Sequence, residues 1–75
     1  MKITKEEMRQ TKIKILKEMH EYIKNHCDEN TYYCWTTAYL PDCPDEEDFE
    51  FIVDDDEFWL ATCTAFGELT KGVRE

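Results

Sequence analysis

The first third of the chain alternates apolar and polar residues with the period of an α-helix. From Thr4 to His26 there is no glycine or proline, and apolar residues recur every three or four positions. At about 100° per residue, one stripe of such a helix carries Met8, Ile15, Leu16, Met19, Tyr22, Ile23 and His26. Thr4 and Glu7 match a capping box, in which each side chain satisfies a backbone N–H of the other residue. The pattern predicts an amphipathic helix over residues 4–26, with His20 as a solvated imidazole toward its polar side.

The rest of the chain has the composition of β-structure. Its apolar runs are rich in aromatic and β-branched residues, which favour strands. We predict three strands, at residues 31–40, 49–53 and 58–66. Pro41 and Pro44 break the first run and introduce an acidic loop at residues 42–48, and the acidic run at residues 54–57 indicates a tight turn. Residues 67–75 begin with a glycine, and we expect them to form a loose tail.

These elements predict an α+β fold, in which one N-terminal amphipathic helix packs on a three-stranded antiparallel β-meander (residues 31–66). A chain of 75 residues has room for one domain, so we assign residues 1–75 to a single small domain. One helix covers only one face of a sheet, and both faces here carry apolar side chains. The alternation leaves open which face packs on the helix. The uncovered face is expected to meet a partner protein or a second copy of the chain.

Charge is distributed unevenly along the chain. The first 26 residues hold seven basic and four acidic residues, a net charge of +3. The remaining residues hold two basic and fourteen acidic residues, a net charge of −12, which gives −9 for the whole chain. Such asymmetry shapes the long-range field and points to a partner of opposite charge. Direct binding of nucleic acid is not expected, because most of the surface would repel a phosphate backbone.

The acidic residues gather in two runs that flank the second predicted strand. Carboxylates on a rigid platform can imitate the charge spacing of duplex DNA, and tryptophans often anchor interfaces. We therefore expect non-catalytic binding of a basic, nucleic-acid-processing protein, as in the small acidic inhibitors that phages and mobile elements encode. The predicted contact residues are Asp45, Glu46, Glu47, Asp48, Glu50, Asp54, Asp55, Asp56 and Glu57, with Trp35 and Trp59 as apolar anchors. The alternative is a structural or regulatory interaction protein, or a homodimer, that uses its aromatic sheet face.

Four cysteines raise the question of a metal site. They are Cys27, Cys34, Cys43 and Cys63. Structural zinc sites use pairs of ligands about two to four residues apart, and the chain has no Cys-x-x-Cys pair. Reduced structural thiols are therefore the main expectation. The alternatives are a small zinc-binding module built on the four cysteines and, in an oxidising compartment, disulfides. The acidic runs lack the glycine of a calcium loop, so we expect no cofactor.

Catalysis and membrane binding find no support in the sequence. A nucleophilic cysteine needs positively charged surroundings, but the residues after position 27 are strongly acidic, which raises the pKa of a thiol. There is no loop of the kind that holds an oxyanion or a phosphate. The first residues lack the apolar core of a signal peptide, and the apolar runs are far shorter than the roughly 20 residues of a membrane span. We therefore expect a cytoplasmic protein, and thiols in that compartment are usually reduced.

Overall fold

The computed structural model describes residues 3–74 of the chain, so Met1, Lys2 and Glu75 of the predicted domain lie outside it. Within the described range every regular element is a helix, and none is a strand. The helices are α1 (Lys5–His26), α2 (Glu29–Ala38), α3 (Glu46–Val53), α4 (Asp56–Leu69) and α5 (Lys71–Arg74). The predicted α+β fold with a three-stranded meander is therefore wrong, and the described chain is all-helical.

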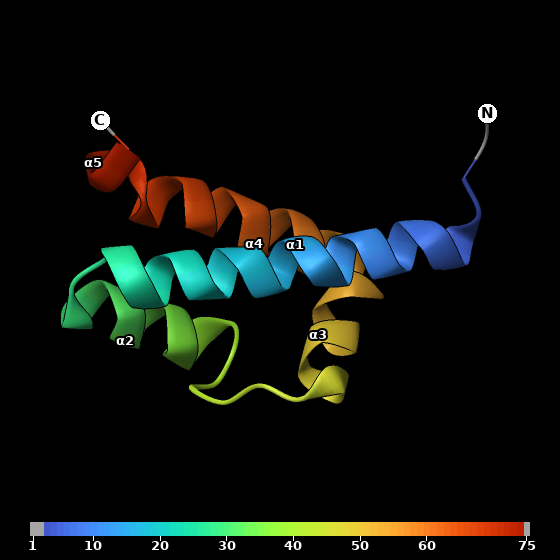
Figure 1. Ribbon diagram of the computed structural model, residues 1–75, viewed down its shortest axis with the longest axis horizontal. Coiled ribbons are helices and arrows are strands. Elements are labelled where there is room, and N and C mark those ends of the chain that lie inside the picture. Colours follow the sequence, from blue (N-terminus) through green and yellow to red (C-terminus); the bar gives the residue numbers. More distant parts are fainter. Residues whose placement is uncertain (1–2, 75) are drawn as a thin grey trace.

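Helix α1 is the spine of the molecule (Figure 1). Helix α2 runs along its C-terminal half, and α3 lies against its N-terminal half. Helix α4 contacts α3 and runs along α1, with the rings of Tyr22 and Phe66 at a centroid distance of 5.8 Å. The connection between α2 and α3 contains both prolines, which the sequence predicted as strand breakers and which here separate two helices. No helix between residues 3 and 74 combines the length and apolar character needed to cross a lipid bilayer.

Helix α1 confirms the helix predicted over residues 4–26. Thr4 is the N-cap, and its hydroxyl oxygen accepts a hydrogen bond from the backbone N–H of Glu7 at 3.0 Å. The same hydroxyl donates to the Glu7 carboxylate at 3.2 Å. Glu7 thus meets the side chain of Thr4, whereas a capping box would use the Thr4 backbone N–H. The cap predicted from the sequence is present in this altered form.

The buried face of α1 differs from the predicted stripe. Its buried residues are Ile13, Leu16, Met19, His20 and Ile23. Met8, Ile15 and His26, which the stripe placed inside, are exposed. The prediction that His20 is solvated is wrong, because Trp35 of α2 packs over this side of α1 and hydrogen-bonds to the imidazole.

Aspartate caps explain why the three predicted strands are helices. The side chains of Asp28, Asp45 and Asp55 accept hydrogen bonds from the backbone N–H three residues later, at 2.9, 3.1 and 3.1 Å. An aspartate cap followed by further acidic residues is a strong start signal for a helix. The predicted acidic loop at residues 42–48 accordingly ends at Asp45, the N-cap of α3. β-propensity depends on context, and here local capping and the packing of helix faces outweigh it.

The C-terminal third is also more helical than predicted. The turn expected at residues 54–57 is confined to 54–55, and residues 56–57 form the first turn of α4. Gly67 was expected to end a strand but lies inside α4, which the short helix α5 follows. The prediction of a loose tail over residues 67–75 is therefore wrong for the residues described.

The core is centred on Trp35, which is fully buried. Its ring lies 5.3 Å from that of Tyr39 and 6.3 Å from that of Phe66, so α2 and α4 meet over α1. The buried apolar residues are Ile13, Leu16, Met19, Ile23, Trp35, Leu40, Phe49, Ile52 and Val53. A small domain buries a limited share of its surface, so the burial of one large ring such as that of Trp35 supplies a large part of its stability.

Candidate functional site

The nine carboxylates singled out by the sequence lie in one part of the molecule, which we call the acidic corner (residues 45–57). They are Asp45, Glu46, Glu47, Asp48, Glu50, Asp54, Asp55, Asp56 and Glu57. The acidic corner consists of α3, its cap, the connection to α4 and the first turn of α4 (Figure 1). A helix N-terminus carries partial positive charge, which stabilises carboxylates in the cap and first turn. Two adjacent helix starts thus bring these residues together.

Part of the charge of the acidic corner serves the local fold. Asp45 and Asp48 form a capping box, in which each carboxylate accepts from the backbone N–H of the other residue, at 3.1 and 2.9 Å. Asp55 caps α4 by accepting from the backbone N–H of Phe58. These three carboxylates satisfy backbone donors that a helix start otherwise leaves unpaired, so they have a structural role without any partner.

Helix α1 neutralises another part of the acidic corner. Nε and Nη2 of Arg9 donate to the two carboxylate oxygens of Asp54 at 2.8 and 3.1 Å, and Nη2 also lies 3.2 Å from Glu50. Lys17 forms an ion pair with Glu46 at 3.2 Å. The hydrogen bond from Arg9 holds the pKa of Asp54 below its ordinary value and raises that of Arg9. The charge asymmetry along the sequence is therefore partly cancelled within the fold.

The acidic corner also holds an exposed aromatic ring. The side chain of Phe51 is 71% exposed, and its ring meets that of Phe58 edge-on at a centroid distance of 5.8 Å. Glu47 lies four residues before Phe51 on α3, and Asp55 and Glu57 lie at the start of α4, the helix that carries Phe58. Glu47 and Glu57 are exposed and form no ion pair with any residue between positions 3 and 74. We call Glu47, Phe51, Asp55 and Glu57 the acidic-aromatic surface.

Neither tryptophan predicted as an anchor belongs to this surface. Trp35 is buried in the core, and Trp59 is half-buried on the side of α4 that faces α1, where Nζ of Lys12 lies 5.3 Å from its ring centroid. Sequence reasoning missed Phe51 because a strand places Phe49 and Phe51 on one face. In a helix, two residues this far apart point to nearly opposite sides, so Phe49 is buried and Phe51 is exposed. A helical reading of residues 46–53 would have found the exposed ring.

All four cysteines are free thiols in the structure. Cys27 and Cys63 are half-buried, whereas Cys34 and Cys43 are exposed. Burial raises the pKa of the Cys27 and Cys63 thiols, and the charge of Asp28 raises that of Cys27 further. A raised pKa lowers the thiolate fraction and with it the reactivity. In the part of the chain that the structure describes, no three His, Cys, Asp or Glu side chains are placed to hold a metal ion.

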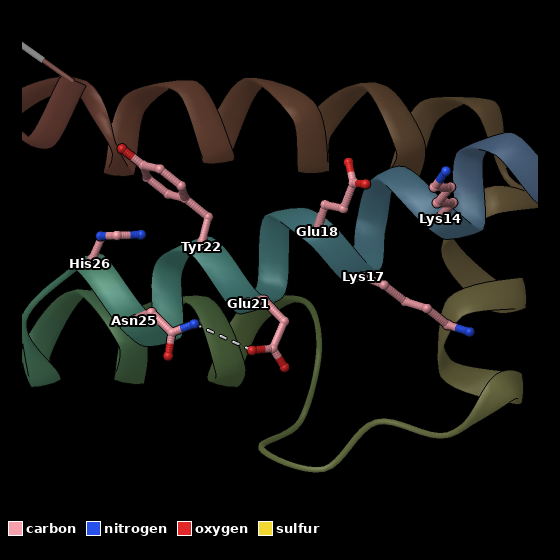
Figure 2. Close-up of a pocket in the computed structure, with 7 residues that line it drawn as sticks. All are labelled: Lys14, Lys17, Glu18, Glu21, Tyr22, Asn25 and His26. Carbon is pink, nitrogen blue, oxygen red and sulfur yellow. Dashed lines mark hydrogen bonds between the residues drawn. The ribbon is translucent and has the colours of Figure 1, made fainter.

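A hollow of about 400 Å³ on the outer face of α1 does not form an ordered site (Figure 2). It is lined by Lys14, Lys17, Glu18, Glu21, Tyr22, Asn25 and His26. Glu18 and Tyr22 point toward α4, whereas Lys17 points toward α3. The Asn25 amide donates to Glu21 at 3.4 Å. Because these side chains diverge and carry both signs of charge, they do not provide the convergent polar groups of a ligand site.

Comparisons of the chain with models of protein families, with curated proteins and with solved structures find no match. The acidic-aromatic surface is the candidate site because it combines free charge with an exposed apolar ring. Its function is therefore argued from its own geometry.

Proposed function

We propose that this chain is a non-catalytic binding domain whose acidic-aromatic surface docks on a basic partner protein. The observation that carries the proposal is the 71% exposure of Phe51 on α3, the helix whose first turn is acidic. Full burial of a phenylalanine side chain contributes about 1.5–3 kcal/mol, most of which remains unrealised while the ring faces water. A partner that covers the ring gains much of that free energy.

The two kinds of side chain contribute to different steps of binding. The exposed carboxylates of Glu47 and Glu57 attract a basic surface over several ångströms, which speeds association at low ionic strength. Phe51 makes its contact only in the docked complex, so it mainly slows dissociation. The expected partner presents lysine or arginine side chains around an apolar depression.

The narrower form of the proposal is mimicry of nucleic acid. Duplex DNA carries one negative charge per about 1.7 Å of its axis, and a protein with a basic groove would accept the acidic corner in its place. The carboxylates that α1 does not hold supply the charge: Asp45, Glu47, Asp48, Asp55, Asp56 and Glu57. In this form, duplex DNA competes with the protein for its partner. A partner that binds without such competition limits the proposal to basic proteins in general.

An affinity capture with matched variants tests the proposal. The immobilised protein is exposed to a lysate of its source cell at low and at high salt, and each captured protein is identified and then purified. We expect a basic protein that high salt releases. With the purified partner, Phe51→Ser should raise the dissociation constant by about tenfold or more, because a buried aromatic contact is lost.

Tyr33→Ser is the matched control. Tyr33 is 68% exposed, similar to Phe51, but it lies on α2 and outside the acidic corner. This variant should bind the partner as the unchanged protein does. Equal binding by Phe51→Ser, or a partner that is not basic, would contradict the proposal. Sedimentation equilibrium of the protein alone shows whether a second copy occupies the surface.

A further inference from the structure

His20 is a buried titratable side chain at the junction of three elements. The residue is 5% exposed and lies on the buried face of α1. Nδ1 lies 3.0 Å from the indole Nε1 of Trp35 in α2, and Nε2 lies 3.4 Å from the backbone carbonyl oxygen of Asp42 in the α2–α3 connection. One imidazole thus joins the spine helix to both α2 and the segment that leads into α3.

The chemistry of these two contacts fixes the position of the proton on the ring. An indole N–H only donates, so Nδ1 of His20 accepts from Trp35 and carries no hydrogen. A carbonyl oxygen only accepts, so Nε2 carries the hydrogen and donates to Asp42. The neutral ring satisfies both contacts. A doubly protonated ring has a second N–H at Nδ1, which would face the indole N–H at 3.0 Å, and two donors cannot share that contact.

The charged and titratable groups around the ring come from α1, α2 and the α2–α3 connection. They are Lys17, Glu21 and Lys24 on α1, Tyr32 on α2, and Asp42 and Cys43 in the connection. The α3 residue beside them, Phe49, is apolar. Two ammonium groups and two carboxylates oppose one another in their effect on a charged imidazole. The indole donor therefore decides which form of the ring fits.

Tyr32 and Asp42 keep their protonation states while an imidazole titrates. The Tyr32 hydroxyl donates to the Asp42 carboxylate. Burial, together with this bond, raises the pKa of Tyr32 to about 12, and the bond holds the pKa of Asp42 below its ordinary value. Neither group changes charge between about pH 5 and 8, where an ordinary histidine does.

We propose that His20 is a proton-operated latch. Its neutral ring holds Trp35 and the α2–α3 connection against α1, and a second proton on the ring breaks the Trp35 contact and releases that side of α2. The inference is independent of the proposed function, because it concerns the α1–α2 interface and not the acidic corner.

Nuclear magnetic resonance of the indole N–H groups tests the latch. The Trp35 signal is assigned with Trp59→Phe, and its protection from solvent exchange is followed between about pH 7.5 and 5.5. We expect the Trp35 protection factor to fall by about tenfold over this range, because one buried hydrogen bond is lost. A Trp35 protection factor that stays constant over the same range would overturn the proposal.

Two asparagine variants separate His20 from the other histidine. His20→Asn places an amide oxygen close to the position of Nδ1, where it accepts from Trp35 and does not titrate. The pH transition of Trp35 should disappear in this variant and remain in His26→Asn, which alters an exposed histidine of the same helix. A transition that persists in His20→Asn, or vanishes in His26→Asn, would assign it to another group and reject the latch.

Discussion

Helix α1 is joined to α2 and to α3 by different kinds of interaction. Toward α2 the contact is a buried tryptophan ring with one internal hydrogen bond to His20. Toward α3 apolar side chains also meet, but ion pairs from Arg9 and Lys17 reinforce the contact at the surface. Burial of apolar area dominates folding energetics, whereas exposed ion pairs contribute little and are screened by salt.

This difference indicates how each helix contact should respond to a change in solution conditions. Added salt screens exposed charges, so it should loosen the α1–α3 contact first. The α1–α2 contact should respond to the loss of packing and, through His20, to the protonation of one ring. The same α3 carries Phe51, so the salt-sensitive side of the molecule is also the side that we propose for binding.

The largest expected effect is on the α1–α2 side. Trp35→Ala removes a fully buried ring and should lower the free energy of unfolding by about 3–5 kcal/mol, a large part of the total for a small domain. Urea unfolding followed by circular dichroism measures the loss. Trp59→Ala is the control, because Trp59 is half-buried and should cost clearly less. Equal losses would show that the core is not centred on Trp35.

An intermediate effect is expected at the start of α3. Asp45→Ala removes the capping box and should lower the free energy of unfolding by about 1 kcal/mol. Glu47→Ala is the control, because Glu47 is an exposed residue of the same helical turn and does not cap the helix. This variant should change the free energy of unfolding by less than about 0.5 kcal/mol. Thermal unfolding of both variants checks the comparison. A larger loss in Glu47→Ala would contradict the structural role assigned to Asp45.

The smallest effect is expected at the α1–α3 ion pairs. Arg9→Gln should destabilise the protein less than Asp45→Ala, and added salt should shrink the difference from the unchanged protein. The pKa of Asp54 is lower in the folded state, so its contribution is present above the ordinary carboxyl pKa of about 3.9 and lost as the pH falls through the folded value. Arg9→Gln should therefore lose less stability than the unchanged protein when the pH drops below about 4.

Lys14→Gln is the control for this prediction. Lys14 is exposed and forms no ion pair within residues 3–74, so its replacement should leave the acid response unchanged. Denaturant unfolding at several pH values and salt concentrations measures all three proteins. An Arg9→Gln variant that keeps the full acid response would remove the Arg9–Asp54 pair as its cause.

The sequence predicted α1 well because its signals agree with one another. An N-cap at Thr4, the absence of glycine and proline, and a helical apolar period all point to one element. At Tyr32, Tyr33 and Trp35 the sequence signals conflict. The aromatic composition favours a strand, whereas the aspartate at position 28 favours a helix start. The prediction weighed composition above capping, and the structure shows that capping was the better guide.

The sequence predicted the acidic residues of the candidate site, but the prediction missed its exposed aromatic ring, Phe51. The acidic runs are visible in the sequence, yet their capping roles and their pairing with α1 depend on the helices they begin. The burial of His20 depends on Trp35 of another helix, and no local pattern around position 20 reveals that neighbour. Phe51 could have been found, because a helical period turns it away from the buried Phe49.

The position of α1 as a spine has a consequence for how the chain reaches its fold. The helices that pack on α1 follow it in the sequence, and α4 follows the helix that it contacts. During synthesis each later helix thus meets a template that is already complete. Helical chains with mostly nearby contacts fold within about microseconds to milliseconds, faster than a ribosome adds one residue. Assembly should therefore keep pace with translation, one helix after another.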